Sequence, residues 1–246
     1  MARYLHGFSI NLLHDDFATY HHKTRRCRMS VIEPQVSFPR LNEKAPDFEA
    51  VSTQGVIKMS SFEGKWVVLF SHPADFTPVC TTEFYGFASE AAEFEKRNVQ
   101  LIGLSVDGVA AHLAWMKDIE DVFGTKVPFP VIADLDMKVS RLYGMIHPGA
   151  SSTAAVRAVF IIDDKQTLRA MIYYPMSAGR SITEILRVVD SLQTTDNNGV
   201  STPANWTPGD PVVVAPPANM SAIETPEEAQ SKGYDYKRWY LRYKNL

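Results

Sequence analysis

Apolar runs alternate with helically spaced apolar residues along most of the chain. Runs typical of buried strands occupy residues 66–70, 99–106, 130–132, 158–162 and 168–174. Apolar residues that recur every three or four positions predict helices at about residues 78–96, 108–123, 136–143 and 181–192. Because strands and helices alternate, we predict an α/β fold in which both faces of a central sheet are covered.

Two details refine this prediction. The last two apolar runs are joined by the polar residues 163–166, a short connection of the kind that joins hairpin strands. We therefore predict an antiparallel pair there and a mixed sheet overall. On the second predicted helix, one face is expected to carry Leu113, Met116, Ile119 and Phe123.

The composition changes after about residue 194. Residues 197–199 (Asn-Asn-Gly) signal a turn, and six prolines follow between residues 203 and 226. We predict that this segment builds no core of its own. Five of its residues are too apolar for a free tail, so we expect it to pack on the main domain or on a partner subunit. They are Trp206, Trp239, Tyr240, Tyr243 and Leu246.

The N-terminal region differs from the rest of the chain. A basic cluster spans residues 21–28, and Asp15 and Asp16 interrupt the sequence before it, which argues against a secretory signal or a mitochondrial transit peptide. We interpret Met29 as an alternative or true translation start, and a disordered basic tail is the other interpretation. We predict an N-terminal extension (1–35), a main domain (36–194) and a C-terminal arm (195–246).

Length, charge and cysteine content narrow the class of protein. A chain of 246 residues can bury a large core, and a net charge of −3 gives no indication of a nucleic-acid surface. No apolar run approaches the roughly 20 residues that span a membrane. Two cysteines form no disulfide framework, so we expect a reducing compartment, the cytoplasm.

One of the two cysteines lies where a strand pattern gives way to a helix. Thr77 is predicted to be the N-cap and Pro78 the first helical residue, which places Cys80 in the first turn. The unpaired N–H groups and the positive end of the helix dipole favour a thiolate there, and a thiolate is the reactive form. The alternative is an inert cysteine that only fills space in the core.

The residues around Cys80 resemble a family signature. Pro73, Thr77 and Cys80 form the pattern P-x-x-x-T-x-x-C, which resembles the active-site motif of the peroxiredoxins, and the neighbouring His72 and Asp75-Phe76 resemble the one-cysteine subfamily. The resemblance covers residues 36–246. It implies a thioredoxin-like fold with a mixed central sheet, followed by a C-terminal peroxiredoxin arm. Further similar stretches lie at 101–107, 129–134, 157–163 and 173–180.

The resemblance implies a thiol-specific peroxidase that reduces hydrogen peroxide and organic hydroperoxides, as in antioxidant defence. Cys80 would attack a peroxide oxygen and become a sulfenic acid. Arg157 matches the active-site arginine of the family, which favours the thiolate and binds the peroxide. The Thr77 hydroxyl would donate to a peroxide oxygen, and Pro73 would shield the site from water. Without the resemblance, a strand-end surface residue is the favoured interpretation of Arg157. Thr77 could be an N-cap alone or have both roles, and Pro73 could equally end the strand.

Three further residues are candidates for supporting roles. Glu83 lies one turn after Cys80 and can orient an arginine, and the resemblance implies Arg180 as its partner. A surface salt bridge is the simpler interpretation of this pair. His72 could donate a hydrogen bond to the thiolate, or it could be a structural histidine.

The cysteine count bears on how the enzyme is reduced. No cysteine follows Cys80, and the only other one, Cys27, lies in the N-terminal extension. We therefore predict a one-cysteine cycle in which an external thiol reductant attacks the sulfenic acid. The resemblance further implies a homodimer or a decamer built from dimers.

The sequence also bears on metal and cofactor sites, on lipase activity and on functions other than a peroxidase. We expect no cofactor and no metal site, because no Cys/His cluster has ligand spacing. No G-x-S-x-G pentapeptide indicates a lipase. The alternative functions are a peroxide sensor or redox-controlled holdase, and a thioredoxin-like binding module with an inert cysteine.

Overall fold

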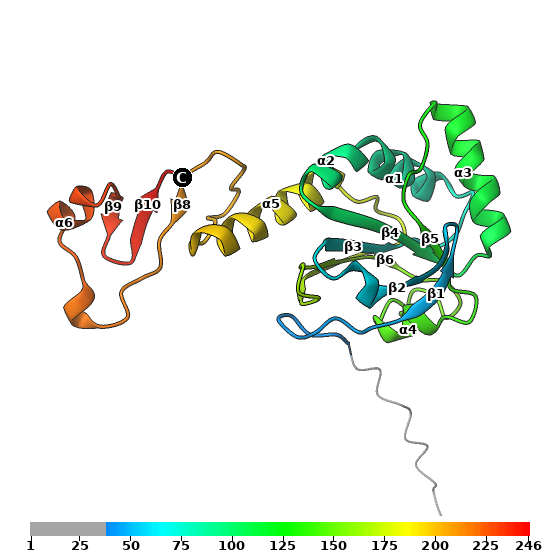
Figure 1. Ribbon diagram of the computed structural model, residues 1–246, viewed down its shortest axis with the longest axis horizontal. Helices are drawn as coiled ribbons and strands as arrows, with labels where there is room; N and C mark the ends of the chain where they lie inside the picture. The colour runs from blue at the N-terminus through cyan, green and yellow to red at the C-terminus, as the bar shows by residue number, and fades with distance from the viewer. Residues whose placement is uncertain (1–37) are drawn as a thin grey trace, which may run out of the picture. The chain divides into compact units, whose positions relative to one another are not determined.

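The computed structural model describes residues 38–246, in which seven strands form one mixed sheet (Figure 1). The strand order is β2-β1-β5-β4-β3-β6-β7. Strands β3, β4 and β5 run parallel, and the β6–β7 pair is the predicted antiparallel hairpin. The strands are β1 (Glu49–Ser52), β2 (Gly55–Lys58), β3 (Trp66–Ser71), β4 (Val99–Ser105), β5 (Val131–Ala133), β6 (Arg157–Ile162) and β7 (Leu168–Tyr174).

Helices cover both faces of the sheet, as the alternation of patterns predicted. Successive residues of β3 point to opposite faces, so Val68 and Phe70 belong to one core and Val67 and Leu69 to the other. The first core is closed by α1, α2, α3 and α5, and the second by α4 and the short 3₁₀ helix η1. The helices are η1 (Met59–Phe62), α1 (Pro78–Ser89), α2 (Ala91–Lys96), α3 (Val109–Phe123), α4 (Lys138–Leu142) and α5 (Ile182–Asn198).

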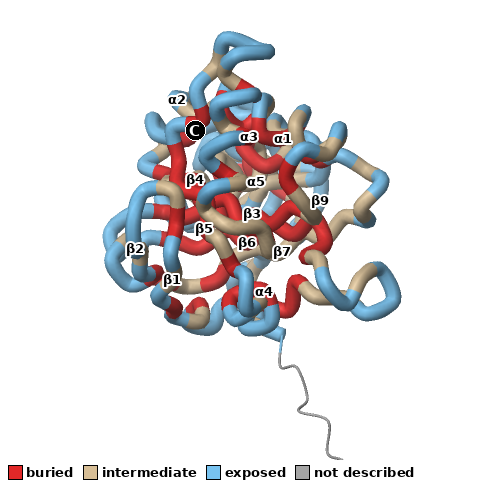
Figure 2. The backbone as a smooth tube through the Cα atoms, turned by 90° about the vertical axis from the view of Figure 1, so that its right-hand side faces the viewer, coloured by how far each residue is buried: buried red, intermediate tan, exposed pale blue. Residues whose placement is uncertain are grey.

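Two neighbouring interior strands, β3 and β6, are buried along their whole length and lead to the site. Every residue of β3 and β6 is buried, and Figure 2 shows these strands in red beneath more exposed helices. The carboxyl end of β3 enters the loop that carries the P-x-x-x-T-x-x-C motif. Burial of β3 and its two neighbours therefore fixes where that loop begins.

Several predicted boundaries were wrong. The helix predicted at 78–96 is two helices that meet at Glu90, and this break lets Phe94 of α2 reach the same core as α1. Helix α5 extends to Asn198 and ends at Gly199, which adopts the left-handed conformation with φ of 62°. The β1–β2 hairpin was not predicted, because its exposed residues form no apolar run.

The predicted buried face of α3 was only partly right, because Ile119 is buried and Met116 packs against the core, but Leu113 and Phe123 do not belong to the buried face. His112, Trp115 and Ile119 are its buried residues, whereas Leu113 is 50% exposed and Phe123 is 40% exposed. The apolar pattern failed here because the helix buries a histidine, which that pattern counts as polar. The reason for the burial of His112 lies in the active-site loop, described below.

The C-terminal segment forms a small sheet but contributes no residue to either core described above. A three-stranded sheet has the order β8-β10-β9, formed by β8 (Val212–Val213), β9 (Asp235–Arg238) and β10 (Leu241–Lys244). The segment also contains η2 (Met220–Ala222) and α6 (Pro226–Ser231). Arg242 is buried and bonds to Glu224 and to the carbonyl of Ala215, so an ion pair replaces part of an apolar core.

The apolar residues of this segment behave differently from one another. Trp206 is buried, and its indole donates to the carbonyl of Asp210 at 3.0 Å. Trp239, Tyr240 and Leu246 are exposed.

Met29 and Cys27 lie outside the described residues. Within residues 38–246, no helix combines the length and the apolar composition that crossing a membrane requires.

Candidate active site

Cys80 occupies the third position of α1, as the sequence predicted. Pro78 is the first residue of the helix, and Thr77 is its N-cap with extended backbone angles. The Thr77 side chain does not cap the helix, however, because its hydroxyl donates instead to the carbonyl of Ala74 at 3.0 Å. The predicted capping bond was therefore wrong, although the predicted helix start was right.

The loop before Cys80 is strained and tied down. Phe76 has a φ of 54° and is 59% exposed, a conformation that costs about 1 kcal/mol or more for a residue with a Cβ. The loop is held by Asp107, whose carboxylate accepts from the backbone N–H of Asp75 at 3.0 Å and from Ser105 at 2.7 Å. Pro73 lies half-buried in the same loop.

Arg157 contacts Cys80 although the two residues are 77 positions apart in the sequence. It is the first residue of β6, and its Nη1 lies 3.2 Å from the Cys80 Sγ, with both residues buried. Its Nε and Nη2 both donate to the carbonyl of Met176, at 2.9 and 2.7 Å. This clamp holds the guanidinium against the sulfur, so Arg157 is not a surface residue of the strand end.

Glu83 joins Arg157 to a second arginine. Its Oε2 accepts from Arg157 Nη1 at 2.8 Å and from Arg180 Nη2 at 2.7 Å. Its Oε1 accepts from the backbone N–H and the Nε of Arg180, at 2.8 and 2.9 Å. Burial acts to raise the pKa of Glu83, but the bonds and charge of Arg180, with the charge of Arg157, hold that pKa below its ordinary value.

The charges of this cluster, which we call the arginine network, do not balance without Cys80. Arg157 and Arg180 contribute two positive charges and the ionised Glu83 contributes one negative charge, which leaves one positive charge in a buried site. A buried charge is costly unless it is paired. An anion next to Arg157, where the Cys80 Sγ lies at 3.2 Å, would balance this charge.

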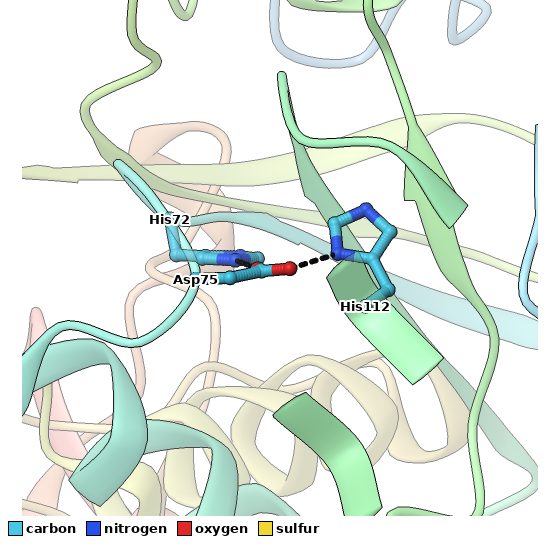
Figure 3. A group of neighbouring side chains, drawn as sticks. All are labelled: His72, Asp75 and His112. Atoms are coloured by element: carbon cyan, nitrogen blue, oxygen red, sulfur yellow. Dashed lines mark hydrogen bonds and ion pairs between the residues drawn. The ribbon is translucent and has the colours of Figure 1, made fainter. Parts of the chain in front are cut away.

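A second buried cluster lies beside the first and includes His72 (Figure 3). His72 Nε2 lies 2.8 Å from Asp75 Oδ1, and His112 Nδ1 lies 2.7 Å from Asp75 Oδ2. We call this cluster the histidine network. His72 is therefore bonded to a carboxylate, and no hydrogen bond joins it to Cys80 in the described structure.

The histidine network also bears on metal binding. Among the described residues, these three side chains are the one group of His, Cys, Asp and Glu with possible ligand atoms within 4.8 Å of one another. Each carboxylate oxygen is already engaged by one ring nitrogen at hydrogen-bond distance. The arrangement is that of a hydrogen-bonded chain.

Four parts of this site were not predicted from the sequence: the bonds of Asp75 to the two histidines, His112 itself, Asp107 and the Met176 carbonyl. Asp75 and His112 are 37 residues apart, so no spacing rule joins them. The Met176 contact uses a backbone oxygen, which has no signal in a sequence. Only the buried position of a histidine on α3 could have drawn attention to His112.

Comparison with known proteins identifies the family. The profile of the AhpC/TSA family matches residues 41–171, more than half of the chain. Peroxiredoxin 2 of Caldanaerobacter subterraneus subsp. tengcongensis is 54% identical over 213 residues, which cover 87% of this chain and 96% of that protein. The chain belongs to the peroxiredoxin family. A peroxiredoxin of Aquifex aeolicus is likewise 54% identical over 84% of this chain and 96% of its own length.

The subfamily follows from the C-terminal segment and from solved structures. The C-terminal domain of one-cysteine peroxiredoxins matches residues 191–228. A yeast mitochondrial one-cysteine peroxiredoxin is 43% identical, with a TM-score of 0.75 over 84% of this chain and 99% of that one. A mutant of peroxiredoxin 6 of Arenicola marina is 41% identical, with the same TM-score over 84% of this chain and 97% of that one.

These findings confirm the predicted subfamily, the thioredoxin-like fold and the predicted class of activity. This peroxiredoxin is a thiol-dependent peroxidase, an oxidoreductase that takes a peroxide as substrate and a thiol as reductant. The sensor, holdase and binding-module alternatives are not favoured.

Proposed function

We propose that Cys80 is the peroxidatic residue and that the arginine network activates it. The observation that carries this proposal is the 3.2 Å contact between Arg157 Nη1 and the Cys80 Sγ, inside a cluster with one unbalanced positive charge. The thiolate attacks one peroxide oxygen, an S–O bond forms, and the O–O bond breaks. The alkoxide that leaves takes up a proton from solvent, and Cys80 becomes a sulfenic acid.

Arg157 and Thr77 bind the peroxide in this proposal. Negative charge moves from sulfur to the leaving oxygen, and donors placed along that path lower the barrier. Arg157 Nη1 is already at the sulfur, and the Thr77 hydroxyl can turn from the Ala74 carbonyl to the peroxide. Pro73 shields the loop from water, while Glu83 and Arg180 act through Arg157 as positioning residues.

We propose that an external thiol completes the cycle. Cys80 is the only cysteine among residues 38–246, and it is free. The yeast relative has a resolving mechanism that uses glutathione and thioredoxin systems, and we propose a reductant of that class here. The thiol attacks the sulfenic sulfur, water leaves, and a second thiol reduces the mixed disulfide.

Assembly, domains and location are part of the proposal. The exposed Trp239, Tyr240 and Leu246 support a homodimer in which the C-terminal arm meets a partner subunit, and dimers of this kind can build a decamer. The boundaries at residues 35 and 194 remain our prediction. The free Cys80 supports a reducing compartment, the cytoplasm.

Two cysteine variants test this proposal together. Cys80→Ser is expected to abolish peroxide consumption with every thiol reductant, because serine is not ionised at neutral pH. Cys27→Ser is expected to turn over as the wild type does. Peroxide consumption is followed with glutathione and with thioredoxin as alternative reductants. A Cys27–Cys80 disulfide after peroxide treatment, or loss of turnover in Cys27→Ser, would contradict the one-cysteine cycle.

A further inference from the structure

Ser71 is the last residue of β3, and its side chain lies on the opposite face of the sheet from Cys80. Alternate residues of β3 point to opposite cores, so Ser71 shares its face with Leu69, which belongs to the second core. On β6 the same alternation places Arg157 on the face of Val159, which belongs to the first core together with Cys80. Ser71 is fully buried, so it meets the site only through the sheet.

The Ser71 hydroxyl joins β3 to β6 at the point where backbone pairing between these strands ends. The last paired residues are Phe70 and Val159, one position short of Ser71. There the Ser71 Oγ accepts from the backbone N–H of Ala158 at 3.1 Å and donates to the carbonyl of Val156 at 2.6 Å. A hydroxyl can accept and donate at once, so one side chain replaces the next pair of backbone bonds.

These two bonds hold the residues on either side of Arg157. The N–H of Ala158 also donates to the carbonyl of Val156 at 3.1 Å, which makes a three-residue turn with Arg157 at its centre. The carbonyl of Ala158 accepts from Arg180 Nη1 at 3.0 Å, so a member of the arginine network holds the same residue. The backbone at Arg157 is therefore fixed from the face that does not carry its guanidinium.

The exact position of Arg157 matters because its contacts are short and directional. Its Nη1 lies 3.2 Å from the Cys80 Sγ, and its Nε and Nη2 share the carbonyl of Met176. The chain that leads into β6 gives little support, since residues 148–153 are mostly exposed. Hydrogen bonds weaken steeply as they lengthen, and a displacement of about 1 Å can lower the rate of an enzyme about a hundredfold.

We propose that Ser71 is a positioning residue that sets where Arg157 meets Cys80. This inference deepens the proposed function of the arginine network and rests on it. Ser71 acts through the backbone, from the other face of the sheet, and not on the peroxide or the sulfur. Loss of its hydroxyl releases the turn at Arg157, so the guanidinium spends less time at the sulfur and the attack of Cys80 on the peroxide slows.

A double-mutant cycle tests whether Ser71 acts through Arg157. Ser71→Ala removes both bonds of the hydroxyl, while Val156 and Ala158 keep the bond to each other. We expect the second-order rate of Cys80 oxidation by hydrogen peroxide, measured by stopped-flow mixing, to fall about tenfold. In the Arg157→Gln background the same change should alter the rate by less than about twofold, because no guanidinium is left to position.

Two control variants separate positioning from a loss of core packing. Ser140→Ala also removes a fully buried hydroxyl, but the Ser140 Oγ has no hydrogen-bond partner among the described residues. Ile162→Val removes a methyl group from the second core, at the far end of β6. Both variants should oxidise Cys80 at the wild-type rate, although Ile162→Val is expected to unfold at a lower urea concentration than the wild type.

A second measurement follows Arg157 directly and needs no peroxide. The Nε–H of this buried side chain donates to the carbonyl of Met176, which slows its exchange with water. Its NMR signal is assigned with an Arg157→Lys variant. Exchange should be about tenfold faster in Ser71→Ala than in the wild type or in Ser140→Ala, because the turn that holds Arg157 opens more often.

The outcomes distinguish this proposal from the proposed function. An unchanged oxidation rate in Ser71→Ala overturns it, and so does an equal fall in the wild-type and Arg157→Gln backgrounds, which would indicate a purely structural role. If Arg157→Gln reacts as fast as the wild type, the proposed function fails instead, and the exchange of the Arg157 Nε–H still reports whether Ser71 holds that residue.

A further variant keeps the proposal testable if Ser71→Ala does not fold. Ser71→Thr retains the hydroxyl, so its oxidation rate should stay within about twofold of the wild type, although the added methyl group lowers stability. A Ser71→Thr protein whose Arg157 Nε–H exchanges as in the wild type would support the proposal. A rate about tenfold lower would overturn it, because the hydroxyl would then not be the deciding group.

Discussion

The two buried polar networks beside Cys80 use the same kinds of group to opposite effect. The arginine network pairs one carboxylate, Glu83, with two guanidinium groups that cannot lose their protons. The histidine network pairs one carboxylate, Asp75, with two imidazole rings that can. In both clusters, hydrogen bonds hold the pKa of the carboxyl group below its ordinary value even though burial acts to raise it.

The difference between the networks is their net charge. The arginine network has one positive charge in excess, so it favours an anion nearby, and the Cys80 Sγ is 3.2 Å from Arg157 Nη1. The histidine network adjusts its protons until it is neutral, so it selects no ion. Instead it leaves His72 Nδ1 as a lone pair. Buried groups that cannot titrate keep their charge and favour an opposite charge on a neighbour. Groups that can titrate gain or lose a proton until the cluster is neutral.

The largest expected effect comes from removing the excess charge. Arg157→Gln leaves the arginine network neutral and removes the donor at the sulfur. We expect the second-order rate of Cys80 oxidation to fall about 10²- to 10³-fold, as for loss of one preorganised donor. Stopped-flow mixing with hydrogen peroxide measures this rate. Arg157→Lys keeps the positive charge but cannot make both hydrogen bonds to the Met176 carbonyl. Its rate should therefore lie between those of the wild type and Arg157→Gln. Equal rates for the two variants would show that charge is not the deciding property.

A smaller effect, on the free energy of unfolding, should distinguish Glu83 from Asp75. Glu83→Gln leaves two buried guanidinium groups unpaired, so the free energy of unfolding should fall by about 3 kcal/mol or more. Asp75→Asn is the matched change in the histidine network, where a neutral amide can still bond to both rings, and we expect a loss of only about 1 kcal/mol. Urea unfolding at neutral pH measures both. Similar losses would mean that the histidine network is as rigidly charged as the arginine network.

The smallest effect is a difference in acid stability. The pKa of Glu83 is lowered by folding, so its contribution to stability is present above its ordinary value of 4.5 and is lost as pH falls through the lower, folded value. The unfolding free energy of the wild type should therefore decline below about pH 4.5, and the decline should be shallower in Glu83→Gln. A decline of the same slope in both proteins would assign acid sensitivity to other carboxyl groups.

Local sequence was enough to predict the part of the site that is continuous in the chain. The junction between β3 and α1, with Pro78 at the first helical position and Cys80 in the first turn, was predicted correctly. It depends on residues a few positions apart, and helix starts obey local rules. The break at Glu90 and the burial of His112 and Trp115 on α3 were not predicted, because packing decides them.

Contacts between residues far apart in the chain could not be predicted from the sequence. A resemblance assigned Arg157 and Arg180 to the site, and helical spacing placed Glu83 near Cys80. Nothing in the sequence indicated that this one carboxylate would hold both guanidinium groups. His112 was missed because its burial depends on Asp75, which lies in a loop far away in the chain. A buried histidine and an exposed one look the same in a sequence.

The amino-acid sequence by itself determined the alternation of strands and helices from β3 to α5, the position of Cys80 at a helix start, and the lack of a second cysteine after it. These depend on hydrophobic periodicity and on the preferences of single residues, which act over a few positions. Only the tertiary structure decided the charge of each buried network. Net charge in a buried site depends on which groups the fold brings within a few ångströms, since each pairing there changes whether a neighbour carries a proton.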